Sequence, residues 1–247
     1  MKRSEINDII RDALEFITQH RFALPPFAAW TPEDWQSKGL EVRELVERSL
    51  GWDVTDFGSG NYQQLGLFLF TIRNGRLADL ETKRGKLYAE KLLVVGQNQI
   101  TPMHFHHHKT EDIINRGGGT LALELFWADE QNRCSNKPIT VFCDGVERHL
   151  EAGGIMRLEA GESITLPARL YHKFWGETSR VLVGEVSTVN DDNTDNFFLE
   201  PVGRFPQILE DKAPFRLLVG DYERYYRGIS NSSLRYKQKS ASCFYDT

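Results

Sequence analysis

The chain has 247 residues, of which 40% are hydrophobic and 26% are charged, and this is the composition of an ordinary globular protein. Its net charge of −5 argues against nucleic acid as the main partner, because phosphate binding favours a clear excess of Lys and Arg. No run of about 18 apolar residues is present, so we expect no membrane span.

The cysteines and the N-terminus indicate the compartment. Cys134, Cys143 and Cys243 have no paired spacing, and the chain opens on a polar segment instead of an apolar leader. Unpaired cysteines are typical of a reducing environment. We therefore expect a cytoplasmic protein.

Helical patterns fill the first 51 residues. Ser4 is the expected N-cap of a first helix, and Thr31, followed by Pro and two acids, is typical of a second helix start. Residues 40–50 continue a helical pattern that stops at Gly51. The apolar face of the first helix consists of Ile6, Ile9, Ile10, Ala13, Phe16 and Ile17. We predict that residues 1–51 form a helical wrap.

From residue 52 the pattern changes to short β-rich runs separated by Gly, Asn and Asp. The runs lie at 65–72, 91–95, 121–127, 139–142, 163–166, 171–175 and 180–186. Helices followed by many strands predict one β-barrel or sandwich with an α-helical N-terminal extension. We assign residues 52–227 to this barrel and the polar residues 228–247 to a loose C-terminal tail.

Three imidazoles and one carboxylate lie at a spacing that suits a divalent metal ion. His104 and His106 point to the same face of an extended strand, because side chains alternate along a strand. Glu111 can return to that face from the start of the next strand, after a turn. His172 follows Pro167, which marks a strand end, and would come from a neighbouring strand. We predict that these three histidines and Glu111 are the metal ligands.

The neighbouring histidines leave a second register open. His106 and His108 also share a face, but then only Lys109 and Thr110 precede Glu111, and the return path is tight. We therefore prefer the pair of residues 104 and 106, with His107 and His108 at the rim. A solvated His-rich surface tract is the plain alternative.

These residues resemble two cupin motifs. The first motif is matched by His104-x-His106-x4-Glu111-x6-Gly118, and the second is similar to Gly161-x5-Pro167-x-Arg169-x2-His172. The second departs from the usual pattern, since Arg169 stands where glycine is usual and Gly176 where asparagine is usual. The departures affect the turn and the surroundings of the site, and not the ligands.

Beyond the motifs, residues 1–226 are similar to the D-lyxose isomerase family of cupin sugar isomerases. The distinctive segments are Arg3–Asn7, Lys91–Leu93, His104–Asp112 and Gly184–Asp192. The resemblance implies a mainly β fold, the cupin double-stranded β-helix barrel, and a homodimer. It also implies an Mn(II)-dependent aldose–ketose isomerase acting on D-lyxose and D-xylulose, with D-mannose and D-fructose as a second pair.

A site of three histidines and one carboxylate suits Mn, Fe, Co, Ni or Zn, and spacing does not choose among them. A bound cation would leave positions open for the adjacent carbonyl and hydroxyl oxygens of an open-chain sugar, and would polarise the carbonyl. Moving a proton between C1 and C2 through an enediol then needs a base. No basic cluster or phosphate-binding loop is evident, so a free sugar is favoured over a phosphorylated one.

Several residues are candidates for catalysis. Glu185 shares a strand face with Val181 and Val183, and it is a candidate base if that face lines the barrel, or a solvated residue if the face is outward. Lys109 is held near the metal by chain connectivity, and we assign it to oxyanion stabilisation. Lys91 is either a cation at the rim of the site or a surface residue.

Two residues are candidates for substrate binding. Trp30, after a double proline, is either a sugar-stacking lid residue or a hydrophobic anchor of the N-terminal segment. Asp191 lies in a polar turn, where carboxylates commonly serve the turn itself.

Two other functions remain open. The same ligands with Fe(II) would suit a cupin dioxygenase, although such a site is more often walled by apolar residues. A non-catalytic sugar-binding cupin is the third reading, and no DNA-binding segment accompanies the barrel.

Overall fold

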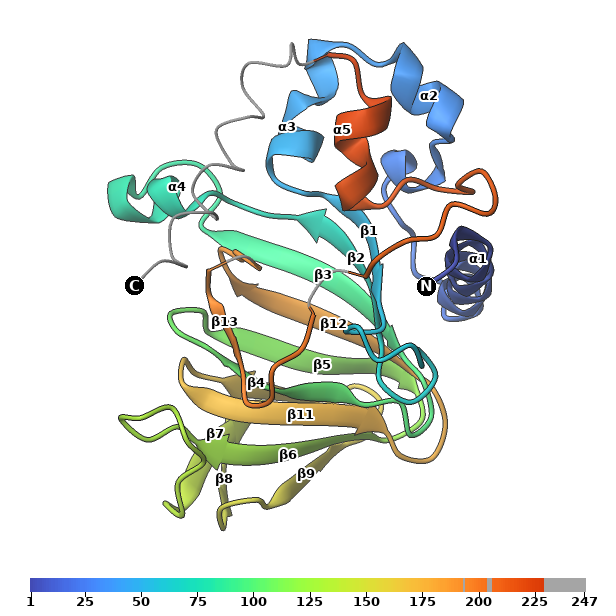
Figure 1. Cartoon of the computed structure of the whole chain (residues 1–247). Helices are drawn as coiled ribbons and strands as arrows, with labels where there is room; N and C mark the ends of the chain where they lie inside the picture. Colours follow the sequence, from blue (N-terminus) through green and yellow to red (C-terminus); the bar gives the residue numbers. More distant parts are fainter. Residues whose placement is uncertain (193, 204–205, 229–247) are drawn as a thin grey trace, which may run out of the picture.

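The computed structural model describes residues 1–192, 194–203 and 206–228, in which two antiparallel sheets face each other (Figure 1). In order across the larger sheet, the strands are β1 (Gly51–Thr55), β2 (Leu67–Arg73), β3 (Tyr88–Val95), β12 (Val181–Thr188), β5 (Glu111–Gly118), β10 (Ser163–Leu166), β7 (Ile139–Cys143) and β8 (Val146–Leu150). In the smaller sheet they are β13 (Asn196–Phe198), β4 (Thr101–His106), β11 (Leu170–Gly176), β6 (Leu121–Trp127) and β9 (Ile155–Leu158).

The barrel interior is filled by side chains at alternate strand positions. Ile139 and Val141 of β7 are buried while Thr140 and Phe142, between and after them, are exposed, which is the pattern of a strand with one wet face. Strands β2 and β3 are buried on both faces. Leu69 belongs to the barrel core, and the adjacent Phe68 belongs to a second core outside the sheet.

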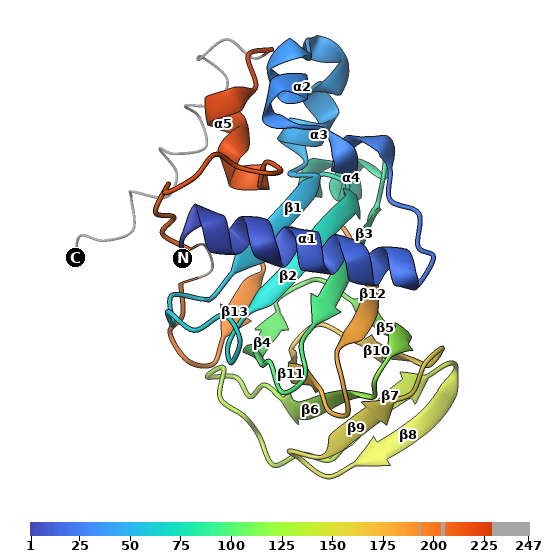
Figure 2. The same ribbon diagram turned by 90° about the vertical axis from the view of Figure 1, so that its right-hand side faces the viewer.

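That second core lies beneath the helix α1 (Arg3–Gln19), which crosses the outer face of β1, β2 and β3 (Figure 2). The buried positions of α1 recur at helical spacing and pack on aromatic side chains of the sheet, notably Trp52, Phe68 and Phe70. The predicted apolar face is therefore confirmed. The predicted N-cap, Ser4, is wrong. The N-cap residue is Lys2, and the Ser4 hydroxyl donates a hydrogen bond to Asp211.

The remaining helical segments are short: η1 (Pro26–Ala29), α2 (Pro32–Ser37), η2 (Leu40–Val42), α3 (Arg43–Glu47), α4 (Leu77–Thr82), η3 (Val219–Asp221) and α5 (Tyr222–Tyr225). Thr31 caps α2 as predicted, since its hydroxyl accepts the Asp34 N–H and the Asp34 carboxylate accepts the Thr31 N–H. Helix α5, which comes from the segment assigned to the barrel, packs against α2 at the top of Figure 1.

The chain changes from helix to strand at Gly51, which opens β1 with a φ of 133° that favours glycine. Of the tail predicted at 228–247, residues 229–247 lie outside the described residues. None of the helices in the described ranges is long and apolar enough to cross a membrane.

A buried arginine joins the two ends of the described chain. The Arg3 guanidinium is 1% exposed and donates to both carboxylate oxygens of Glu210 and of Asp221, at 2.7–2.9 Å. These paired bonds are the strong, charge-assisted kind. They fix the start of α1 to the segment that leads into α5.

We predict that Arg3→Met lowers the free energy of unfolding by about 3 kcal/mol, because it leaves buried carboxylate charge without its partner. Urea unfolding measures this change. Arg43→Met is the control, since its ion pair with Glu47 is exposed and should contribute little. Equal effects of the two substitutions would contradict the role given to Arg3.

Candidate metal centre and catalytic pocket

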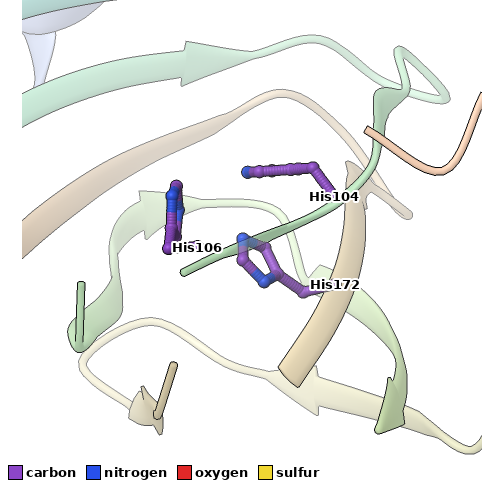
Figure 3. Close-up of side chains that lie close together, drawn as sticks. All are labelled: His104, His106 and His172. Atoms are coloured by element: carbon purple, nitrogen blue, oxygen red, sulfur yellow. The ribbon is translucent and has the colours of Figure 1, made fainter. Parts of the chain in front are cut away.

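Three histidines converge inside the barrel (Figure 3). His104 and His106 come from β4, and His172 comes from β11, where it pairs directly with His104 across the two strands. Their ligand nitrogens lie within 4.8 Å of one another. Phe105, between the two histidines of β4, points the other way and stacks on Phe197 at 5.0 Å, as strand alternation requires.

Unsatisfied polar atoms show that this cluster fits a metal ion. The Nε2 atoms of His106 and His172 and Oε1 of Glu111 are buried and have no hydrogen-bond partner within the described structure. Buried polar atoms are normally satisfied, and leaving them unpaired is costly. A divalent cation among three imidazoles would satisfy such atoms, and three histidines are a common donor set for these ions.

Burial also keeps two of the imidazoles in their ligand form. Desolvation holds the pKa of His104 well below its usual value, and the neighbouring His172 and His106 lower it further. Desolvation and then the charge of Lys109 lower the pKa of His106. Both rings are therefore neutral at pH 7, which is the state that binds metals.

Glu111 faces the same space from the first position of β5. Its Oε1 lies 3.1 Å from Nε2 of His172 and 3.4 Å from Nε2 of His106, while its Oε2 lies 2.6 Å from Nζ of Lys109. Burial alone would raise the pKa of Glu111, but Lys109, together with His106 and His172, holds this pKa well below the usual range. Glu111 is therefore an anion in the position predicted for the fourth ligand.

A buried network of charges adjoins the histidines. Nζ of Lys109 lies 2.8 Å from Oε1 of Glu185 and 3.2 Å from Oδ1 of Asn190, in addition to its contact with Glu111. Burial would lower the pKa of Lys109, but Glu111 and Glu185 raise it above its usual value. Nζ of Lys91 lies 2.7 Å from the same Asn190 oxygen and 3.2 Å from Glu185.

The pocket that holds these groups has two kinds of wall. Its apolar lining consists of Phe57, Leu67, Leu69, Leu93, Phe174 and Phe198. The polar lining consists of Lys91, Thr101, His104, His106, Lys109, Glu111, Glu185, Asp192 and Asn196. Within the part of the chain that the structure describes, Oγ1 of Thr101 and Oδ1 of Asn196 are buried without a hydrogen-bond partner. Both are free to bind a polar ligand.

The structure brings together most of the residues proposed from the sequence. Glu185 and Lys91 form a cross-strand pair between β12 and β3, and both side chains are buried and point into the barrel. The face of β12 that carries Glu185 is therefore the inner face, and Lys91 is not a surface residue. His107 is half-buried beside Phe105 and Phe197, and His108 is exposed.

Two candidates lie elsewhere. Trp30 packs edge-on against Trp35 at 5.3 Å and does not line the pocket described above. It packs against a small hydrophobic core made of Trp35, Val42, Val46, Leu217, Tyr222 and Tyr226. This placement corresponds to the hydrophobic anchor. Asp191 accepts the Thr194 hydroxyl in the polar turn, while its neighbour Asp192 lines the pocket.

Asn190 was missed by the sequence reasoning, and so were Thr101 and Asn196. Asn190 follows the strand that carries Glu185, and two hydrogen bonds with Asn74 fix its backbone. Proximity to Glu185 was the available signal for Asn190. No local pattern distinguishes Thr101 or Asn196 from ordinary polar residues.

Both departures from the second cupin motif have a structural reason. Arg169 adopts the left-handed conformation that favours glycine, with a φ of 65°. Its guanidinium binds the carbonyl of Asp129 at 2.7 Å and the side chain of Asn132 at 2.9 Å, and these contacts offset the strained backbone. A side chain at Gly176 would place Cβ 2.4 Å from the carbonyl of Ser179, so glycine is required there.

Comparisons with known proteins agree with this geometry. The model of the D-lyxose isomerase family matches residues 1–222. The chain belongs to the D-lyxose isomerase family. It is 47% identical over 228 residues to the D-lyxose/D-mannose isomerase of Escherichia coli O157:H7, covering 91% of this chain and 100% of that protein. It is 46% identical to the D-lyxose/D-mannose isomerase of Serratia proteamaculans, covering 91% and 99%.

Among solved structures, the L-ribose isomerase of Cellulomonas parahominis bound to L-ribose matches with a TM-score of 0.55 and 18% identity, covering 85% of this chain and 98% of that one. The L-ribose isomerase of Geodermatophilus obscurus matches with a TM-score of 0.56 and 16% identity over the same shares. At this identity the likeness concerns the fold. The predicted mainly β cupin fold and the membership of a sugar isomerase family are both confirmed.

We predict that His104→Ala, His106→Ala, His172→Ala and Glu111→Ala each lower the bound metal, because each removes a donor from the cluster. Metal analysis of the purified variants after loading with Mn(II) measures this. His108→Ala is the control and should keep its metal, because that side chain is exposed outside the pocket. Full metal content in His104→Ala together with loss in His108→Ala would show that the register of the ligands is wrong.

Proposed function

We propose that this protein is a metal-dependent aldose–ketose isomerase that interconverts free D-lyxose and D-xylulose, with D-mannose and D-fructose as a second pair. The observation that carries the proposal is the buried Glu185, flanked by two lysines, beside a histidine cluster that fits a metal ion. The names of the relatives from Escherichia coli and Serratia proteamaculans support the choice of sugars.

His104, His106, His172 and Glu111 would hold the ion in this site. We propose Mn(II), since the donor set of imidazoles and one carboxylate suits it, although Zn, Co, Ni and Fe share that chemistry. When bound, such a cation supplies Lewis-acid polarisation of the sugar carbonyl.

The chain's own residues move the proton. Glu185 takes the proton from C2 of the open-chain aldose, the C2–H electron pair forms the C1=C2 double bond, and the carbonyl oxygen takes up a proton from water. The enediol then gives the proton of its O2 hydroxyl to water, the C2=O double bond forms, and C1 receives the proton held by Glu185 to give the ketose. Lys91 and Lys109 contact the carboxylate of Glu185 at 3.2 and 2.8 Å and hold it in place in the pocket.

The two lysines have different capacities. Nζ of Lys109 has three polar oxygens within 3.2 Å, one each from Glu111, Glu185 and Asn190, so its three donors are engaged. It holds the two carboxylates in place. Nζ of Lys91 has two such oxygens, from Asn190 at 2.7 Å and Glu185 at 3.2 Å, so one of its three donors remains. We therefore move the oxyanion-stabilising role, assigned to Lys109 from the sequence, to Lys91. Thr101 and Asn196 offer partners for the sugar hydroxyls.

We further propose a homodimer in the cytoplasm, as the family resemblance and the cysteine usage suggest. Among the described residues, Cys134 and Cys143 are free thiols, which agrees with a reducing compartment. The molar mass in solution tests the dimer.

With Mn(II) added and oxygen excluded, the purified protein should convert D-xylulose to D-lyxose, because the proposed proton transfer consumes no oxidant. Chromatography of the sugars measures the products, and a panel of free pentoses and hexoses establishes the preference. A strict requirement for O2 and Fe(II) would instead identify a cupin dioxygenase. Tight sugar binding without turnover would identify a non-catalytic cupin.

Glu185→Gln should lower kcat by a factor on the order of 10²–10⁴, which is the usual contribution of a general base. Its metal content should stay intact, because the isosteric side chain keeps an oxygen beside the lysines. Glu90→Gln is the matched control, as Glu90 precedes Lys91 on the same strand and forms a partly exposed ion pair with Arg73.

The same experiment in D2O reports the route of the proton. Turnover of D-xylulose should place deuterium at C2 of the aldose, because the base exchanges its proton with solvent. Aldose without solvent deuterium, together with a near-normal rate of Glu185→Gln, would indicate a hydride shift and remove Glu185 from its role.

A further inference from the structure

One histidine of the cluster differs from the other two in the partner of its outer nitrogen. Nδ1 of His104 lies 2.7 Å from the carbonyl oxygen of Pro102, and Nδ1 of His172 lies 3.0 Å from that of Leu170. In both cases the partner is the carbonyl two residues earlier on the same strand. Nδ1 of His106 is buried and has no hydrogen-bond partner within the described structure.

The charged oxygen that faces this nitrogen belongs to Asp195. Its Oδ2 lies 4.0 Å from Nδ1 of His106, and the residue is 6% exposed. Asp195 comes from the connection between β12 and β13, far from His106 in the sequence. The Asp195 carboxylate therefore approaches His106 from a segment other than β4, the strand that carries His106.

Asp195 also binds the turn between β4 and β5, which connects His106 to Glu111. Its Oδ1 accepts the N–H of His108 at 2.8 Å and its Oδ2 accepts the N–H of Lys109 at 3.1 Å. Its main-chain carbonyl accepts the N–H of His107 at 2.9 Å. Three successive N–H groups are thus bound by one residue, so the position of the carboxylate relative to His106 is fixed by the backbone.

We propose that Asp195 is the positioning residue of His106, accepting a hydrogen bond from its Nδ1–H when Nε2 binds the metal. This inference rests on the proposed metal-dependent function. A ligand histidine normally donates its other N–H to a carbonyl or carboxylate, which fixes the tautomer and ring orientation and raises the basicity of the ligand nitrogen. The carbonyls of Pro102 and Leu170 serve the other two rings, and Asp195 serves the third with a full negative charge.

The plain alternative is that Asp195 only closes a turn. Asp129 provides a matched control, because its carboxylate also accepts two main-chain N–H groups, those of Gln131 and Arg133 at 2.9 and 2.8 Å. Among the described residues, the ion pair of Asp129 is with Arg133 and not with a ligand histidine. Substituting asparagine at each position therefore compares loss of a turn carboxylate with and without a ligand histidine.

The first test is the affinity of the metal-stripped, full-length protein for Mn(II), measured by titration calorimetry. Asp195→Asn should weaken binding by about 10- to 100-fold, and Asp129→Asn should leave it unchanged. Equal affinity of the unmodified protein and Asp195→Asn would overturn this inference alone. Failure of the unmodified protein to bind Mn(II) would overturn the proposed function with it.

The second test uses the unmodified protein and does not depend on the folding of a variant. With Zn(II) bound and histidine labelled with ¹⁵N, nuclear magnetic resonance should show three slowly exchanging Nδ1–H protons, one from each ligand histidine. One of them, bonded to a carboxylate, should lie downfield of the two bonded to carbonyls. Only two protected Nδ1–H signals in the unmodified protein would overturn the assignment.

Discussion

The site depends on one buried cation. Lys109 is 2% exposed and lies between the carboxylates of Glu111 and Glu185, which are themselves buried. Two carboxylates in such an interior would repel each other, and each alone would be costly to desolvate. The ammonium group offsets both costs at once. It thereby allows the two carboxylates to lie together in the interior beside the histidines.

The two sheets divide the chemistry between them. The smaller sheet supplies the three histidines through β4 and β11, and the larger sheet supplies Glu111, Glu185 and Lys91 through β5, β12 and β3. Lys109 lies in the turn from β4 to β5, where the chain passes from one sheet to the other. Its side-chain contacts therefore do more than neutralise charge, since they tie this turn to Glu111 and Glu185 of the larger sheet.

Strand alternation explains why much of the site was predictable. It placed His104 and His106 on one face and Phe105 on the other without any knowledge of the barrel. The same rule grouped Glu185 with Val181 and Val183 but left open which face is inside, because that depends on the helix α1 covering the opposite face. Trp30 shows the limit for aromatic residues, which look alike in a sequence whether they line a pocket or fill a core.

The residues that escaped prediction share a different origin. Asn190 and Asp195 come from the irregular connection after β12. This connection folds back onto the turn of residues 107–110 between β4 and β5. Their roles consist of hydrogen bonds to main-chain and lysine nitrogens 80 or more residues away in sequence. Such contacts are set by the closure of the barrel and leave no periodic signal in the chain.

The pocket combines a polar and an apolar lining. Beside the polar groups, Leu69 and Leu93 of the larger sheet and Phe174 of the smaller sheet line the pocket. Apolar side chains cannot bind sugar hydroxyls, but they exclude water and lower the local dielectric, which strengthens the charge interactions in the pocket. A single strand supplies both kinds of wall, since Lys91 and Leu93 are neighbours on the inner face of β3. The alternation of side chains that builds the barrel core thus also places the charged Lys91 next to that core. Asn190, from the connection after β12, then binds the Lys91 ammonium group.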